Sequence, residues 1–284
     1  HLGDWGTQFG KMIAAYKHWG SREAIEQGGV QALSDLYVRF HEEEARDPAL
    51  EQEGRDWFKR IEDGDEEALS IFNWFKALTL KDADRVYDLL GVSLTDADIR
   101  GESAYNDVLP DVVAALDAAG LLTESQGAQC VFLDDDAFRG SEGEPVPVIV
   151  RKSDGGYLYA TTDLAALRYR CRTLGATRIL YATDARQAFH FAQIFAVARA
   201  AGFAGPEVSL EHVPFGVMLN EAGRPFKTRE GGTIKLADLL NEAVQRAAAV
   251  VAEKNPDLPA DQAARVARAV GIGAVKYADL SMDR

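Results

Sequence analysis

Residues 156–202 read GYLYATTDLAALRYRCRTLGATRILYATDARQAFHFAQIFAVARAAG, and this stretch decides the fold. Residues 156–161 alternate toward a strand, and Asp163 opens a segment with apolar residues at three- and four-residue spacing. These apolar residues are Leu164, Leu167, Cys171 and Leu174. Gly175 follows them, as is typical at the end of a helix.

The second half of this stretch repeats the pattern. Residues 178–183 predict the next strand, and residues 187–201 predict the next helix, which Gly202 closes. Strands that alternate with helices over short connections are typical of a parallel sheet covered by helices, so we predict an α/β fold of this type. Ligands bind at the carboxyl ends of the strands in such sheets.

Four polar side chains lie near the predicted strand ends, namely Tyr159, Asp163, Asp184 and Gln187. We therefore expect a ligand site at this edge of the sheet. For each residue alone the alternative is a helix cap or a turn, and capping competes directly for Thr162 and Asp163.

Upstream of this stretch, residues 7–90 predict a helical segment, because apolar residues recur at helical spacing with many charges between them. Leu33, Leu36, Tyr37 and Phe40 are an example. The acidic run HEEE at 41–44 is interpreted as a solvated helix face. A metal site is the alternative, but no second ligand cluster is spaced to complete it.

Residues 92–148 have short runs separated by turn signals, which predicts a small inserted module. Three aspartates at 134–136 lie in one of these turns. An exposed turn explains them better than a cation site does, because a calcium loop also needs later acidic positions and a fixed glycine.

Residues 211–232 read EHVPFGVMLNEAGRPFKTREGG and place Lys227 and Arg229 around Thr228, before paired glycines. Cations, a hydroxyl and a glycine-rich backbone suit a mobile loop that grips phosphates. An ordinary exposed basic turn is the alternative.

The helix expected next has Leu236, Leu239, Leu240 and Ala243 on one face. Lys235 near its start opposes the helix dipole, so we expect a partner for that charge.

The composition is that of a globular protein with one large or two modest domains: 284 residues, 47% apolar and 27% charged. With 45 acidic and 31 basic residues the net charge is −14, which argues against a protein that coats nucleic acid but leaves room for a local basic patch. Only Cys130 and Cys171 occur, too few for a disulfide framework or a cysteine zinc site, and this usage fits a reducing cytoplasm. The sequence has no apolar run of about 18 residues, so we expect no membrane insertion.

Five further segments follow one another along the chain: GDWGTQFG at 3–10, GESAY at 101–105, YATTDLAA at 159–166, FKTR at 226–229 and GAVKYADLS at 273–281. In this order they resemble the class I arginyl-tRNA synthetases in their bacterial form. The resemblance implies a Rossmann-like catalytic domain with a helical segment, split by a connective insertion. We place the first part of the core at 1–95, the insertion at 96–148, and the second half at 149–234 with a mobile signature loop at 225–232. Residues 235–284 form a helical segment that leads toward an anticodon-binding domain.

The family's reaction implies L-arginine, ATP with Mg²⁺, and tRNA(Arg) as partners. Arginine is activated as arginyl-adenylate with release of pyrophosphate, and the arginyl group then passes to the terminal ribose of the tRNA. The resemblance implies that Tyr159 and Asp163 bind the guanidinium and that Gln187 helps to fix the amino acid. A carboxylate is the natural bidentate partner of a guanidinium, and a phenol adds a hydrogen bond or a ring contact.

By the same resemblance, residues 226–229 take the place of the Lys-Met-Ser-Lys-Ser signature, although neither lysine of that signature has its usual position in PFKTR. The implied catalytic residues are Lys227, Thr228 and Arg229. The implied ATP-binding residues are His190, His212, Phe215, Gly216, Val217 and Phe226. His190, one turn beyond Gln187, is in the alternative interpretation a packed or solvated histidine.

The family's His-x-Gly-His signature lies upstream of the segment at 3–10. We therefore expect the chain to be the core of a longer enzyme with an N-terminal domain and a C-terminal anticodon-binding domain, and to be inactive or nearly so alone. We further expect a cytoplasmic monomer. In the longer enzyme the additional domains carry much of the tRNA contact, and within this chain we expect residues 271–284 and the neighbouring helix to contribute. Two other hypotheses stay open: another class I synthetase-like nucleotide transferase, and a non-catalytic arginine- or partner-binding module.

Overall fold

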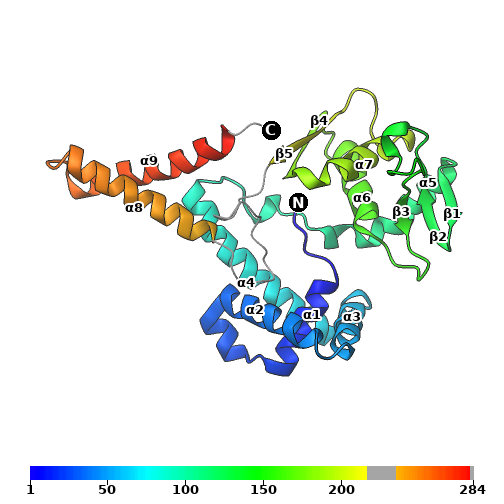
Figure 1. Ribbon diagram of the computed structural model, residues 1–284, viewed down its shortest axis with the longest axis horizontal. Coiled ribbons are helices and arrows are strands. Elements are labelled where there is room, and N and C mark those ends of the chain that lie inside the picture. The colour runs from blue at the N-terminus through cyan, green and yellow to red at the C-terminus, as the bar shows by residue number, and fades with distance from the viewer. Residues whose placement is uncertain (216–234, 282–284) are drawn as a thin grey trace. The chain divides into compact units, whose positions relative to one another are not determined.

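The computed structural model describes residues 1–215 and 235–281, which belong to two compact units (Figure 1). The sheet unit holds residues 1–3 and 100–215, and the helical unit holds residues 4–99 and 235–281. Each unit has its own hydrophobic core.

The sheet unit contains a parallel pair of strands, as predicted. β4 (Arg178–Asp184) and β5 (Ser209–Phe215) pair in register from Arg178 opposite Ser209 to Asp184 opposite Phe215. A separate antiparallel sheet has the order β1 (Leu122–Ser125), β2 (Ala128–Val131) and β3 (Val148–Arg151). The helices are α5 (Leu109–Ala118), α6 (Tyr159–Arg172), α7 (Ala188–Ala200) and the short 3₁₀ segments η2 (Glu102–Val108), η3 (Asp136–Phe138) and η4 (Ala185–Gln187).

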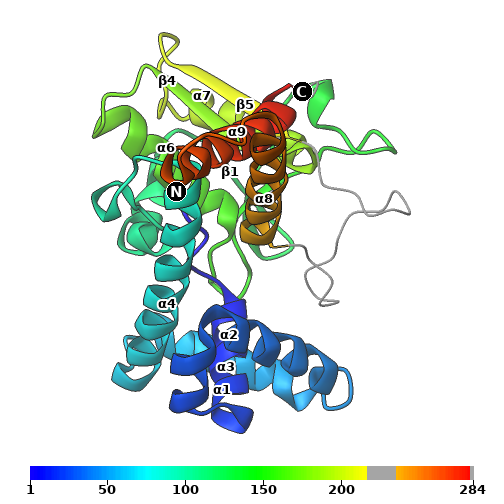
Figure 2. The same ribbon diagram turned by 90° about the vertical axis from the view of Figure 1, so that its left-hand side faces the viewer.

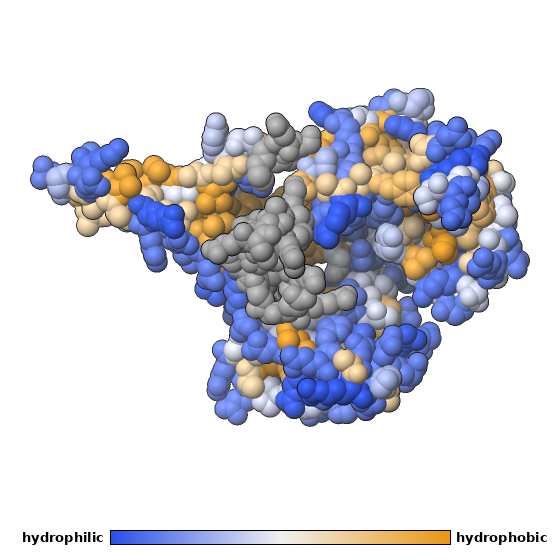
Figure 3. All heavy atoms as spheres, in the orientation of Figure 1, coloured by the Kyte–Doolittle hydropathy of each residue, from blue (hydrophilic) through white to orange (hydrophobic). Residues whose placement is uncertain are grey.

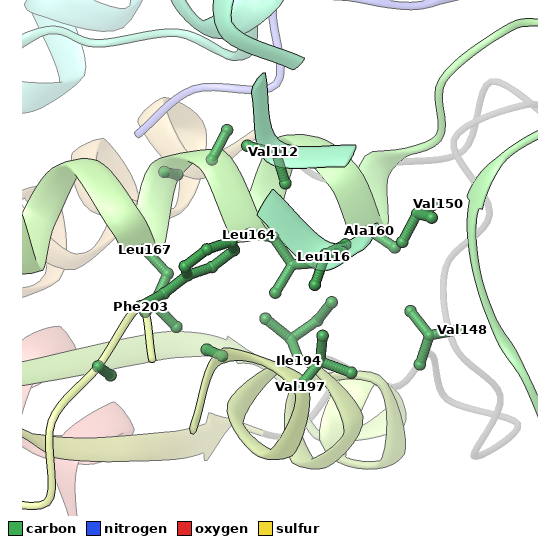
Figure 4. Packing of buried hydrophobic residues seen from close by; sticks show 14 of the residues in the cluster. Val112, Leu116, Val148, Val150, Ala160, Leu164, Leu167, Ile194, Val197 and Phe203 are labelled. Atoms are coloured by element: carbon green, nitrogen blue, oxygen red, sulfur yellow. The ribbon is translucent and has the colours of Figure 1, made fainter. Parts of the chain in front are cut away.

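The core of this unit forms where α6 packs between α5, α7 and the strands (Figure 4). Leu164 and Leu167 of α6, and Ile194 and Val197 of α7, are completely buried. Burying each such side chain contributes about 1.5–3 kcal/mol. The spacing of these residues therefore fixes which side of each helix faces inward, and with it the side on which the polar residues of α6 and α7 lie.

The predicted strand at 178–183 and the predicted helix at 187–201 are confirmed to within one residue at either end. Gly175 and Gly202 have φ of 62° and 65°, a backbone conformation that favours glycine after a helix. Leu174, by contrast, was expected on the buried face but follows the end of α6 and is 62% exposed.

The predicted strand at 156–161 is wrong, because α6 already begins at Tyr159. The strand lies earlier, as β3, and belongs to the antiparallel sheet. A turn at Gly155, with φ of 86°, then leads the chain into the helix. The hydroxyl of Thr161 donates to the carbonyl of Val150, which ties the first turn of α6 to β3 and outweighs the strand preference of this threonine.

Capping by Thr162 or Asp163 is also wrong. Leu158 occupies the N-cap of α6 without a side-chain cap, and both polar residues lie inside the helix. Asp184 does behave as the cap or turn residue of the alternative interpretation, because its carboxylate accepts the backbone N–H of Arg186.

The helical prediction for residues 7–90 is confirmed. The helical unit contains α1 (Thr7–Trp19), α2 (Arg22–Glu44), α3 (Ala49–Glu62), α4 (Glu66–Leu90), the short η1 (Asp96–Asp98), α8 (Leu236–Lys254) and α9 (Ala260–Leu280). Ile13, Ile25, Leu33, Phe72 and Phe75 are among the buried residues that join α1, α2 and α4.

α8 and α9 lie side by side as a helical pair (Figure 2). Apolar side chains remain exposed along this pair, including Val250, Val270 and Tyr277 (Figure 3). The expected partner of Lys235 is found at the start of α8, where its ammonium donates to the side-chain oxygen of Gln31. That partner is a neutral amide and not a carboxylate.

The acidic run at 41–44 is solvated only in part. Glu42 is exposed, but the side chains of His41 and Glu44 are only 21% and 17% exposed. The Glu44 carboxylate contacts His41 and the ammonium of Lys11 on α1. Burial acts to raise the pKa of Glu44, yet the hydrogen bonds and charges of Lys11 and His41 hold it below its ordinary value.

The three aspartates at 134–136 form the exposed turn that was predicted. The side chains of Asp134 and Asp136 are fully exposed, and Asp135 accepts the backbone N–H of Ala137. The boundaries predicted for an insertion at 96–148 stay a prediction, since residues 100–215 share one compact unit. No described helix is long and apolar enough to cross a membrane.

α1 and α3 approach each other closely at Gly10, where a Cβ atom would lie 2.0 Å from the carbonyl oxygen of Gly54. We therefore expect Gly10→Ala to lower the free energy of unfolding by about 2–3 kcal/mol through overpacking. Gly273→Ala is the matched control, because Gly273 is also helical and has no atom within 4 Å of its Cβ position. The control should be neutral or stabilising by up to about 1 kcal/mol. Urea unfolding followed by circular dichroism measures both, and equal stabilities would contradict the close approach.

Candidate active site

The candidate site lies where the two parallel strands end. β4 and β5 finish side by side at Asp184 and Phe215. After β4 the chain passes through η4 into the start of α7, and the start of α6 carries the remaining candidates. The carboxyl edge of the parallel pair is thus bordered by two helix starts, which is where ligands bind in open α/β sheets.

Asp163 on α6 and His190 on α7 form a hydrogen-bonded pair across this edge. The Nε2 atom of His190 lies 2.7 Å from Oδ2 of Asp163, and each side chain is only 15% exposed. Sequence reasoning selected both residues but did not predict their contact, because they are 27 positions apart on different helices. The expectation that His190 reaches the nucleotide is untested, and one ring nitrogen is already engaged with Asp163.

Tyr159 completes this cluster from the first residue of α6. Its ring centroid lies 4.7 Å from that of His190, and the side chain is 62% exposed. Asp163 follows one helical turn later, so the phenol and the carboxylate lie on the same side of α6. Tyr159, Asp163 and His190 therefore form one continuous group with an aromatic side open to solvent.

Gln187 lies at the end of η4, one turn before His190, and is exposed. Within the described parts of the chain its side chain has no hydrogen bond. It is therefore available to a ligand at this edge. Asp184, the other carboxylate predicted here, is not available: Arg186 holds Oδ1 through its backbone N–H and Nε, and Oδ2 through Nη2.

His212 lies on β5 beside the same group. Its Nε2 is 2.8 Å from the hydroxyl of Thr183 on β4, and its ring stacks on Phe191 at 5.3 Å. Phe215 ends β5 and is 41% exposed. Gly216, Val217, Phe226, Lys227, Thr228 and Arg229, which complete the predicted nucleotide and catalytic set, lie outside the described residues.

Tyr181 on β4 packs against Phe191, on which the ring of His212 stacks. It was not selected as a site residue from the sequence, because there it is one aromatic residue in a strand. Its ring lies 4.8 Å from that of Phe191, and its hydroxyl accepts a hydrogen bond from Arg170 at 2.9 Å. Burial raises the pKa of Tyr181 to about 12, partly opposed by the charge and hydrogen bond of Arg170. The phenol is therefore neutral, and its ring packs against Phe191.

The binding chemistry of Tyr159, Asp163 and His190 depends on the atoms that remain open to a ligand. Asp163 uses one carboxylate oxygen toward His190, so its second oxygen can accept a further donor. Exposed aromatic surface beside a half-buried carboxylate suits a planar cation. Among the described residues, no three histidine, cysteine, aspartate or glutamate side chains are grouped to hold a metal ion.

The contact between Asp163 and His190 is testable by a double-mutant cycle. We expect Asp163→Ala and His190→Ala to show a coupling of about 1–2 kcal/mol in the free energy of unfolding, because a shielded hydrogen bond to a charged group is lost. The pair Asp184 and Arg186 is the control, with the arginine side chain 77% exposed, and should couple by no more than about 0.5 kcal/mol. Additive effects of the two alanine substitutions would show that the pair does not form.

Comparison with known proteins places the chain in a family. The family description "tRNA synthetases class I (R), catalytic domain" matches residues 1–284. The chain is 54% identical over 288 residues to the arginine–tRNA ligase of Azotobacter vinelandii, covering all of this chain and 48% of the relative. It is 53% identical over 287 residues to that of Alcanivorax borkumensis, with coverage of 100% and 49%. The chain thus spans about half the length of these curated relatives.

Solved structures agree with this assignment. The crystal structure of arginyl-tRNA synthetase from Plasmodium falciparum superposes with a TM-score of 0.76 at 27% identity, covering 100% of this chain and 45% of that one. The Thermus thermophilus arginyl-tRNA synthetase superposes with a TM-score of 0.70 at 22% identity, covering 97% of this chain and 50% of that one, and supports the fold.

Proposed function

The chain belongs to the class I arginyl-tRNA synthetases, matching their catalytic domain over its whole length, and from this premise we propose that it supplies the core that activates L-arginine for transfer to tRNA(Arg). The observation that carries the proposal is the group of Tyr159, Asp163 and His190 at the carboxyl edge of β4 and β5. Its open carboxylate oxygen and exposed ring suit the guanidinium of arginine.

In this proposal the guanidinium binds Asp163 through the oxygen that His190 leaves open, while Tyr159 contacts the cation with its ring or its hydroxyl. His190 acts as a positioning residue, because its hydrogen bond fixes the plane of the carboxylate. Gln187, exposed at the start of α7, contacts the amino-acid end of the substrate. Asp184 has no part in binding because Arg186 occupies it.

The bound arginine then reacts with ATP. An oxygen of the arginine carboxylate attacks the α-phosphorus, the bond to the bridging oxygen breaks, and pyrophosphate leaves with that electron pair. The substrate carboxylate is already ionised, so no protein base is needed, and positioning with charge neutralisation supplies the rate. The ribose hydroxyl at the end of the tRNA then attacks the arginyl carbonyl and releases AMP.

The nucleotide site of this proposal uses the end of β5. His212, held by Thr183 and Phe191, and Phe215 line the adenine and ribose side. Gly216 and Val217 are assigned to the same side by family resemblance alone. Phe226, Lys227, Thr228 and Arg229 are assigned to the nucleotide and its phosphates by family resemblance. Mg²⁺ is bound mainly through substrate phosphates and water in such reactions, so we propose that it enters with ATP. That the protein is a cytoplasmic monomer stays a prediction.

The affinity of the 284-residue chain for L-arginine, measured by calorimetry, tests the proposed site. We expect Asp163→Asn to weaken L-arginine by about 100-fold, because the guanidinium loses a shielded charged partner. Tyr159→Phe should cost about 3–10-fold if the hydroxyl takes part. Asp184→Asn is the matched control and should change affinity less than about twofold, since its carboxylate is already paired. Equal losses for Asp163→Asn and Asp184→Asn would refute the assignment.

Citrulline, which replaces the guanidinium by a neutral urea of similar shape, should bind about 1000-fold more weakly than arginine, because it leaves the carboxylate without a cation. Calorimetry with citrulline in place of arginine measures this difference.

Arginine-dependent exchange of pyrophosphate into ATP, with tRNA present, then separates the candidate functions. We compare the 284-residue chain with a longer polypeptide that includes the flanking segments of its relatives. If the longer protein catalyses exchange and Asp163→Asn abolishes that exchange, the ligase is supported. If both proteins bind arginine but neither catalyses exchange, a binding module is supported.

A further inference from the structure

A hollow separate from the proposed arginine site lies in the sheet unit, near the C-terminal end of α6. It has a volume of about 280 Å³, and Arg100, Arg168 and Arg172 contribute guanidinium groups to its lining. Asp163 precedes Arg172 by nine residues on α6, which separates the two places by about 13 Å along the helix. The hollow is therefore distinct from the arginine site proposed above.

Arg100 lies against two aromatic rings at this hollow. Its guanidinium carbon lies 3.9 Å from the ring centroid of Tyr169 and 5.0 Å from that of Tyr105, which is itself only 2% exposed. The two rings are inclined to each other by 68°, so they border the guanidinium from two directions. The Nε atom of Arg100 is buried and has no hydrogen-bond partner, so the terminal N–H groups are the donors that a ligand can reach.

Arg168 and Arg172 are similarly placed on an aromatic support. Their guanidinium carbons lie 5.5 Å and 5.7 Å from the ring centroid of Phe203. Each donates one long hydrogen bond to a backbone carbonyl, Arg168 to Asp111 at 3.5 Å and Arg172 to Gly202 at 3.3 Å. They are four residues apart, so they are neighbours on one helix face.

None of the three arginines forms an ion pair with a carboxylate of the described residues. Some other arginines of this unit do, as in Arg178 with Glu211 and Arg139 with Asp136, whereas Arg170 and Arg199 bond to neutral oxygens. The helix dipole accounts for a cation in the last turn of α6, as at Arg172, but not for Arg100, which comes from another segment. The hollow is also lined by Asp111, which forms no ion pair with these arginines, so three guanidiniums face one carboxylate there. This excess of positive charge, in a chain of net charge −14, indicates a site for an anion.

We propose that this hollow binds a phosphate of the RNA backbone. The inference rests on the proposed function, which makes a tRNA the partner. A polyanion approaching an acidic protein needs a local cluster of cations, and arginine forks match phosphate oxygens bidentately. The aromatic rings at the same place also give a ribose or an unstacked base a surface to pack on.

The tRNA contact expected from residues 271–284 is less well supported by the structure. Lys276 is the basic residue in the described part of that segment, and its ammonium already donates to the carbonyl of Leu90. The arginine hollow is the better candidate, because its guanidiniums are not engaged by carboxylates.

The test is the affinity of the 284-residue chain for a fluorescently labelled tRNA(Arg) transcript, measured by anisotropy between 50 and 200 mM KCl. We expect the double variant Arg168→Gln/Arg172→Gln to bind about 10-fold more weakly at 100 mM KCl. The slope of log affinity against log salt should fall by about 1–2, because one or two phosphate contacts are lost. Arg139→Gln removes one exposed charge of the same unit as the control and should stay within about twofold of wild type. Circular dichroism checks that every variant folds.

Arg100→Lys separates a planar fork from a simple charge and should weaken RNA binding although the charge is kept. Wild-type RNA affinity in the double variant would overturn the proposal. If that variant loses only the binding of inorganic phosphate or pyrophosphate, the hollow serves a free anion and the RNA proposal is likewise overturned. L-Arginine binding is measured in parallel: its absence in the wild type, with RNA binding still sensitive to the three arginines, would refute the proposed function and leave the RNA site standing.

Discussion

The burial of α6 is the constraint on which the sheet unit depends. Its leucines and alanines fill the core against α5, α7 and the strands, and Thr161 ties its first turn to β3. A helix anchored in this way cannot rotate without exposing its leucines, which would lose their favourable burial. The polar residues at its two ends are therefore held in fixed positions. Tyr159 and Asp163 lie at the carboxyl edge of the parallel strands, and Arg168 and Arg172 lie beside the hollow near the C-terminal end of the helix.

The pair of Asp163 and His190 shows how such a scaffold prepares a polar group for a ligand. Both side chains are largely shielded from water, so charge interactions there are stronger than at an open surface. A hydrogen bond from the histidine fixes one carboxylate oxygen and leaves the other free. Asp184, the last residue of β4, has both of its oxygens held by Arg186. The two carboxylates thus differ in the oxygens that they leave open to a ligand.

The acidic composition is compatible with the nucleic-acid partner proposed above because charge is distributed unevenly. The net charge of −14 sets the long-range field, while recognition of a phosphate depends on a few donors at short distance. In the sheet unit three guanidiniums lie near the rings of Tyr169, Tyr105 and Phe203, and these cation–π contacts offset part of their mutual repulsion. The helical unit uses its charges differently, since the ammonium of Lys11 on α1 pairs with the carboxylate of Glu44 on α2, which His41 also contacts.

Periodicity in the sequence was sufficient to determine the helices at 7–90, the strand at 178–183 and the helix at 187–201, because these depend on local apolar spacing and on glycines that end helices. A parallel sheet was also predicted, but its second strand was not: the strand at 178–183 pairs with β5, where no strand was predicted from the sequence. The sequence pattern was also sufficient to select Tyr159, Asp163 and Gln187 as candidates. The sequence misled at 156–161, where the alternation in GYLYAT predicts a strand but a hydrogen bond from Thr161 to β3 and burial in the core favour a helix. Only the tertiary structure paired Asp163 with His190, removed Asp184 from the site, and brought Arg100 next to Arg168 and Arg172. Those contacts join residues far apart in the chain or depend on which oxygen a side chain leaves open, and no local pattern records either.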